Sequence, residues 1–158
     1  MRLELTRRGD YAVRAMIALA SDGEGLMNAR TIAAEMAIPP RFLPQVMADL
    51  VRAGLVEGVT GRSGGYRLSA APSETSLLRI VEAVEGTSRR ETCVLRGGPC
   101  GRDGTCAVHG AFAGAEEAMI GALDSVSLAD VSEGGPKRVS SAERDAVVST
   151  RAAGRGGR

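Results

Sequence analysis

Residues 55–69, LVEGVTGRSGGYRLS, have the pattern of two short strands joined by a tight reversal. Extended runs at 55–60 and 66–69 flank the segment GRSGG, and glycine adopts the backbone angles that such reversals need. We therefore expect a β-hairpin that carries a basic residue, Arg62, at its tip.

Three segments with helical periodicity precede this hairpin, at 6–21, 29–36 and 41–53. Thr6 and Asn28 are placed to cap the first two, and Gly54 is placed to end the third. Pro44 lies inside the third segment, where proline kinks a helix unless it falls in the first turn. That helix is therefore expected either to begin later than Arg41 or to bend. Its expected buried residues are Phe42, Val46, Leu50 and Val51.

The sequence after the hairpin changes composition twice. A fourth helix, capped by Ser73 or Thr75, runs to Gly86, and a polar, glycine-rich stretch with all three cysteines follows it. An alanine-rich helix then begins near Val108, a short terminal turn follows it, and the remainder is expected to be disordered because it has little apolar content. We divide the chain into a first domain at 1–86, a cysteine loop at 87–107, a long helix at 108–131 and a tail at 132–158.

The order helix, turn, helix and glycine-tipped hairpin is that of a winged helix-turn-helix, so we expect a mainly α fold with a small β-hairpin wing that binds double-stranded DNA. The start of the second helix of the pair enters the major groove, which makes Arg41 a candidate for guanine and Gln45 a candidate for adenine. Arg62 is a candidate for phosphate or the minor groove, and Arg30 for phosphate. The net charge is only +1, so binding must come from locally placed arginines. The plainer interpretation of each arginine is a solvated surface charge.

Cys93, Cys100 and Cys106 form a C-x6-C-x5-C pattern, and the single histidine of the chain, His109, follows three residues later. Three thiolates and an imidazole can form a four-ligand site for zinc or an iron–sulfur cluster. Structural zinc sites use tighter cysteine pairs, so we favour the cluster and keep zinc as the alternative. The plainer interpretations are three unrelated free cysteines and a surface histidine at the start of a helix.

Several other functional classes find no support in the sequence. It contains no C-x-x-C pair, G-x-G-x-x-G, P-loop or nucleophile-elbow motif, which argues against an enzyme. It has no apolar run long enough to span a bilayer and no apolar run behind a basic start, as a signal peptide would need. We therefore expect a cytoplasmic protein without a membrane partner, whose cysteines are reduced and available for chemistry.

Four stretches together resemble the Rrf2 family of bacterial regulators: LTRRGDYA at 5–12, LVRAGLV at 50–56, RSGGYRL at 62–68, and the three-cysteine loop. This resemblance implies a dimeric winged-helix repressor whose loop cysteines bind an iron–sulfur cluster. One type within the family implies a histidine shortly after the third cysteine, here His109, as the fourth ligand. The nitric-oxide-sensing type implies instead an acidic residue of the partner subunit, here Asp10, which otherwise serves as a first-turn acid of its helix.

The sequence also departs from parts of the family pattern. Thr60 stands where some members carry an arginine just before the wing glycine, and the first cysteine gap is longer than usual. The cluster type, 2Fe–2S or 4Fe–4S, therefore stays open.

The predicted function is that of a homodimeric repressor that senses redox state, nitric oxide or iron through this cluster. The alternative is a zinc-binding or metal-free winged-helix regulator that responds through cysteine thiol oxidation. Whether the cluster-loaded or the cluster-free form binds DNA is left open by the sequence.

Overall fold

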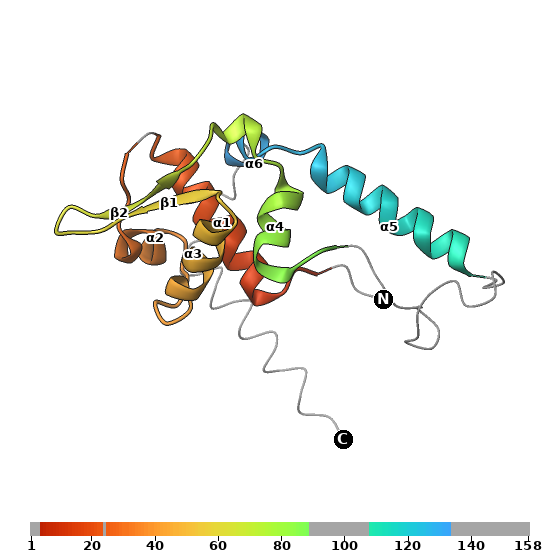
Figure 1. The fold of residues 1–158 in the computed structure, drawn as a ribbon, viewed down its shortest axis with the longest axis horizontal. Helices are drawn as coiled ribbons and strands as arrows, with labels where there is room; N and C mark the ends of the chain where they lie inside the picture. Colours follow the sequence, from red (N-terminus) through yellow and green to blue (C-terminus); the bar gives the residue numbers. More distant parts are fainter. Residues whose placement is uncertain (1–3, 24, 89–107, 134–158) are drawn as a thin grey trace, which may run out of the picture.

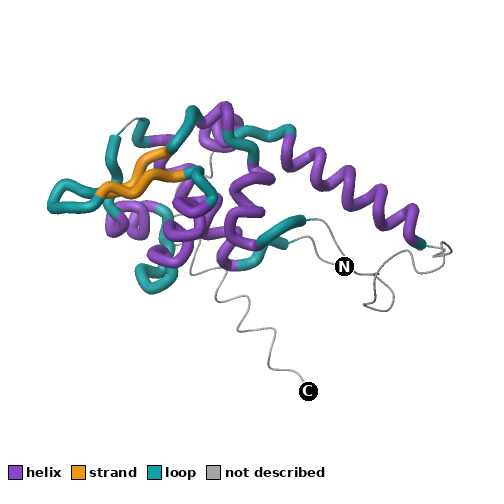
Figure 2. The backbone as a smooth tube through the Cα atoms, in the orientation of Figure 1, coloured by secondary structure: helices purple, strands orange, loops and turns teal. Residues whose placement is uncertain are grey.

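The computed structural model describes residues 4–23, 25–88 and 108–133, and this part is mainly helical with one antiparallel hairpin (Figures 1 and 2). The three cysteines lie outside the described residues, as does the expected tail from residue 134 onward. No helix in the described part is long and apolar enough to cross a membrane. The elements are α1 Arg7–Ser21, α2 Ala29–Glu35, α3 Leu43–Arg52, β1 Val56–Val59, β2 Gly65–Leu68, the 3-10 turn η1 Pro72–Glu74, α4 Leu77–Glu85, α5 His109–Asp124 and α6 Leu128–Glu133.

Local capping places the first two helices as the sequence predicts. The Thr6 side chain accepts a hydrogen bond from the Gly9 backbone N–H at 3.2 Å, and the Asn28 side chain accepts one from the Thr31 N–H at 2.9 Å. Gly54 follows α3 with a φ of 71°, a left-handed conformation that favours glycine.

The third helix begins later than Arg41, at Leu43, so Pro44 occupies its second position. Proline is tolerated there because the N–H it lacks has no partner within the helix. The side of the helix that faces the core carries the buried residues Leu43, Val46, Met47 and Leu50. The expectation that Val51 is buried was therefore wrong, because Val51 lies at the edge of this face and is 40% exposed.

The cap predicted for the fourth helix was also wrong, because α4 is capped by Ser76 and not by Ser73 or Thr75. Ser73 lies within η1, and the Thr75 carbonyl accepts a hydrogen bond from the Leu128 N–H at 2.7 Å. This contact with a distant segment fixes the chain in an extended conformation at Thr75 and delays the start of the helix to Leu77.

The core surrounds α1, which packs against α3, α4 and α6. Its largest fully buried side chains include Met16, Leu19, Ile32, Leu50, Ile80 and Leu128. Leu128 belongs to α6, which is a helix where the sequence predicts a short turn, and which extends to Glu133, inside the expected tail. The N-terminal domain is therefore completed by residues from the far end of the described chain.

The long helix α5 leaves this core. Figure 1 shows it running outward from α6, away from the helix-turn-helix and the hairpin. It packs against α4, and none of its 16 residues is buried.

Candidate nucleic-acid interface

Helices α2 and α3 and the hairpin lie together at the end of the molecule that is opposite α5 (Figure 1). The turn between the two helices contains Ala37 at a φ of 52°, which is unusual for a residue other than glycine. The turn is closed by a hydrogen bond from the Ile38 N–H to the Ala33 carbonyl at 2.9 Å, and Ile38 is buried. Burial of Ile38 thus fixes α3 relative to α2.

The hairpin is tied to the start of α2 through its second strand. Tyr66 and Met27 exchange backbone hydrogen bonds of 3.0 and 2.9 Å. A Cβ at Gly65 would lie 2.8 Å from the Met27 carbonyl oxygen, and one at Gly64 would lie 2.3 Å from that of Val59. The two glycines therefore allow backbones to approach more closely than a side chain would permit, which positions the hairpin tip beside the two helices.

The outward face of α3 is mostly uncharged. Opposite its buried residues it exposes Pro44, Gln45, Ala48, Val51 and Arg52. Pro44, Ala48 and Val51 also line a groove of ≈ 410 Å³ whose far wall is the hairpin, with Val59 and Tyr66. A helix with small apolar residues on its outer face can contact thymine methyl groups, and Gln45 and Arg52 can contact base edges.

The four residues predicted to contact DNA all lie at this end of the structure. Arg30 is exposed at the second position of α2, and Arg62 is exposed at the hairpin tip. Neither side chain has a hydrogen-bond or ion-pair partner within the described ranges. Arg41 precedes α3, with its guanidinium carbon 4.7 Å from the centre of the Phe42 ring. Gln45 lies on α3, and its contacts with DNA, like those of the arginines, stay predictions.

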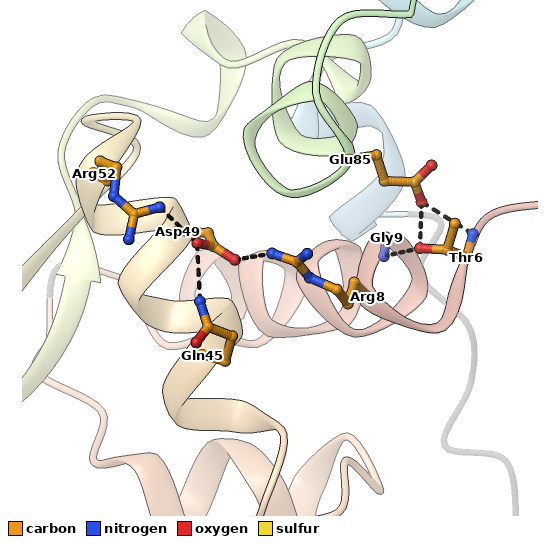
Figure 3. A network of polar contacts seen from close by, with 7 residues as sticks. All are labelled: Thr6, Arg8, Gly9, Gln45, Asp49, Arg52 and Glu85. Carbon is orange, nitrogen blue, oxygen red and sulfur yellow. Dashed lines mark hydrogen bonds and ion pairs between the residues drawn. The ribbon is translucent and has the colours of Figure 1, made fainter.

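A polar cluster that the sequence did not predict holds α3 against α1 (Figure 3). Asp49 is buried, and its carboxylate accepts hydrogen bonds from Arg8 of α1, from Arg52 at 2.8 Å and from Gln45 at 3.2 Å. Burial raises the pKa of the Asp49 carboxyl, but the hydrogen bonds from Arg8 and Arg52 outweigh burial, and the pKa lies below its usual value. The spacing of Gln45, Asp49 and Arg52 on one helix was a visible signal for part of this cluster.

A second polar contact joins the start of α1 to the end of α4. The Glu85 carboxylate accepts hydrogen bonds from the Thr6 backbone N–H at 3.0 Å and from the Thr6 hydroxyl at 2.8 Å (Figure 3). Thr6 lies two residues before Arg8, and Glu85 lies immediately before the segment that leads to the cysteines. The first turn of α1 thus contacts both α3 and α4.

The candidate fourth ligands of the cysteine site lie on different helices. His109 is the first residue of α5 and is exposed. Asp10 lies in the first turn of α1, where its carboxylate forms an ion pair of 2.9 Å with Arg14. The three cysteines lie outside the described residues, so of the predicted ligands the structure places His109 and Asp10 alone. The described residues contain no group of three that could hold a metal ion.

Comparison with known proteins identifies the family. The Rrf2 family, described as an iron-dependent transcriptional regulator, matches residues 5–134. The regulator NsrR of Geobacillus kaustophilus is 33% identical over 83% of this chain and 90% of its own length. The regulator IscR of Aliivibrio salmonicida is 31% identical over 82% of this chain and 77% of its own length.

Solved structures agree with this assignment. CymR, the global cysteine regulator of B. subtilis, is similar with a TM-score of 0.72 and 28% identity, over 85% of this chain and all of its own. IscR of T. potens has a TM-score of 0.67 and 28% identity, over 84% of this chain and 88% of its own. The chain therefore belongs to the Rrf2 family and is a DNA-binding transcriptional regulator with a winged-helix fold, not an enzyme.

Proposed function

We propose that this regulator is a repressor that senses redox state, nitric oxide or iron through an iron–sulfur cluster bound by Cys93, Cys100 and Cys106. The observation that carries the proposal is the grouping of all the cysteines of the chain in one segment between α4 and α5. Three thiolates are a suitable donor set for such a cluster, and their wide spacing does not match the tight pairs of structural zinc sites. When bound, the cluster would supply one-electron redox chemistry and reactivity toward nitric oxide.

We further propose His109 as the fourth ligand. It begins α5 directly after the cysteine segment, so the same short stretch of chain carries all four donors. Asp10 of the partner subunit is the alternative. Its carboxylate already forms an ion pair with Arg14, whose guanidinium also donates to the Met36 carbonyl at 3.4 Å. A ligand role for Asp10 would have to replace or share this local contact.

The proposed homodimer rests on the exposed surface of α5. This helix contains few charged residues, and its exposed face carries a stripe of small ones. Small residues let two helices approach closely, so a second α5 can cover this stripe across a two-fold axis. Dimerisation would place two α3 helices at a fixed separation, as recognition of two half-sites requires. The stripe consists of Ala111, Gly114, Ala115, Ala118 and Ala122.

The DNA-binding role then falls to the end of each subunit that carries α3 and the hairpin. Arg30 and Arg62, which are exposed on α2 and at the hairpin tip, would contact phosphates, and Arg41 and Gln45, which lie around the start of α3, would contact bases. Because the cysteine segment joins α4 to α5, a change at the cluster would act at the connection between the DNA-binding domain and α5, the helix of the proposed dimer contact.

A second candidate is a regulator that responds through its thiols, with zinc or without metal. The similarity to CymR of Staphylococcus aureus favours it, since that protein is described in an oxidized form, with 26% identity and a TM-score of 0.66. The two candidates differ in the metal content of the protein and in its colour.

The deciding experiment is the visible absorption spectrum of protein purified without oxygen, with iron, sulfide and zinc assayed on the same sample. We expect a coloured protein with iron and sulfide in matched amounts, and loss of both in the Cys93→Ala, Cys100→Ala and Cys106→Ala variants. His109→Ala and Asp10→Ala distinguish the fourth ligand, because only the true ligand should shift the spectrum. A colourless protein that gains no iron or sulfide on reconstitution would refute the cluster and leave the thiol regulator.

A further inference from the structure

The buried acid of α3, Asp49, has no role in the function proposed so far. Asp49 is 4% exposed, and it lies directly behind the outward face of α3. Two of the three side chains that donate to it, Gln45 and Arg52, belong to that outward face (Figure 3). The third, Arg8, comes from α1 and anchors the carboxylate to the core.

We propose that Asp49 is a positioning residue for DNA recognition, which fixes the Gln45 amide and the Arg52 guanidinium and so determines the base that they read. The proposal rests on the proposed placement of α3 in the major groove. It adds two residues, Asp49 and Arg52, to the set that determines specificity.

The amide of Gln45 shows how the carboxylate acts. The amide of an unrestrained glutamine can flip, so that its oxygen and its nitrogen change places. Here Nε2 donates to Asp49 at 3.2 Å, and the reversed amide would direct one oxygen at another. Gln45 is therefore held with its oxygen and its second N–H directed away from Asp49, and this pattern is complementary to the N6 donor and N7 acceptor of adenine.

Arg52 is held by the same carboxylate but stays open to a ligand. Its side chain is 72% exposed, while Nη1 lies 2.8 Å from Asp49. One carboxylate thus faces the charges of two arginines, Arg8 and Arg52, and limits how freely either can contact a phosphate. Removing the carboxylate should loosen base selection and strengthen general attraction to the DNA backbone.

This opposite pair of effects distinguishes positioning from a purely structural role. A variant that merely destabilised the fold would lower the affinity for every duplex. Loss of positioning should lower the preference for the correct base while the affinity for unrelated duplexes rises. The salt dependence should also steepen, because a released arginine displaces one more counterion for each phosphate that it neutralises.

The test starts from the preferred site of the full-length protein, selected from a pool of randomised duplexes. Affinities for all four bases at each position are then measured for wild type, Asp49→Asn, Gln45→Ala and the double variant. Where Gln45→Ala removes a preference, we expect Asp49→Asn to reduce it by roughly fivefold to 100-fold. Asp49→Asn should have no further effect there in the Gln45→Ala background. Glu74→Gln removes the same charge from η1 and should leave both preference and salt slope unchanged.

The outcomes separate this inference from the function on which it depends. If wild type selects no sequence, or Gln45→Ala alters no position, the placement of α3 in the major groove is wrong. If Gln45→Ala alters a position and Asp49→Asn does not, only the role of Asp49 is refuted. Should Asp49→Asn fail to fold, Asp49→Ala removes the acceptor altogether, since the side chains of Arg8 and Arg52 are 53% and 72% exposed and can turn to solvent. An unchanged preference in that variant would equally overturn the role of Asp49.

Discussion

Substitution of Gly9 by alanine should destabilise this protein, although alanine is the better helix former. Gly9 lies in the first turn of α1, and a Cβ there would lie 2.1 Å from Oε1 of Glu85. No such contact is tolerated, so the Glu85 carboxylate has to move. It would then lose its hydrogen bonds of 3.0 and 2.8 Å from the N–H and hydroxyl of Thr6.

Two opposing effects set the change in the free energy of unfolding caused by Gly9→Ala. Alanine in place of glycine stabilises a helix by about 0.5–1 kcal/mol. The two hydrogen bonds to Glu85 are exposed, so each contributes about 1 kcal/mol, below the usual value for bonds to a charged group. The loss exceeds the gain, and Gly9→Ala should lower the free energy of unfolding by about 1 kcal/mol.

A double-mutant cycle with Glu85→Ala tests this contact further, because the effect of Gly9→Ala on stability should change sign when Glu85 is shortened. Once Glu85 is shortened, nothing remains for the new Cβ to displace, and Gly9→Ala should stabilise by about 0.5–1 kcal/mol. Urea unfolding at one fixed protein concentration measures all four proteins. Gly110→Ala is a matched control, since Gly110 also lies in the first turn of a helix but its Cβ would meet nothing within 4 Å. An equal effect of Gly9→Ala in both backgrounds would refute the contact with Glu85.

Three further predictions concern pH, assembly and DNA. In the folded protein, the pKa of the Asp49 carboxyl lies below its usual value of 3.8. The ionised carboxylate therefore stabilises the fold above this usual value, and the stabilisation is lost as the pH falls through the pKa of the folded state. Asp49→Asn should therefore lose less stability than wild type between pH 5 and pH 3, as measured by urea unfolding. Ala118→Glu places a carboxylate in the proposed α5 contact and should weaken the dimer by roughly tenfold or more in sedimentation velocity, and an unchanged dimer would exclude this face. Arg30→Ala and Arg62→Ala should each reduce the salt slope of DNA binding by about 1 per subunit and weaken all duplexes alike, whereas a base-specific loss would mean that these arginines read sequence.

Features that depend on neighbouring residues were predictable from the sequence. The caps Thr6 and Asn28 act over three residues, and the hairpin tip needs glycines where backbones approach closely. Helix, turn, helix and hairpin therefore appear in the predicted order, with strand bounds that differ by about one residue, which is within ordinary boundary uncertainty.

Features that depend on distant residues were not predictable in this way. Ser73, Thr75 and Ser76 are all acceptable caps, and the choice is made by a hydrogen bond from Leu128, more than 50 residues away in the chain. Arg8 and Asp49 are 41 residues apart, so no periodicity relates them. Asp49 was overlooked for this reason, although its spacing to Gln45 and Arg52 could be read from the helix itself.

The first turn of α1 joins the parts of the molecule that a sensor has to couple. Thr6 contacts Glu85, at the end of the helix that precedes the cysteine segment, and Arg8 contacts Asp49, behind the recognition helix. Contact alone does not show that the two sites are coupled. Coupling requires that the first turn of α1 can adopt two conformations, and that the end of α4 and the α3 site each favour one of them. Gly9→Ala should create such a second arrangement, because its Cβ would displace the Glu85 carboxylate. The base preference of that variant at the position read by Gln45 therefore measures directly how strongly the end of α4 and the DNA-reading face are linked.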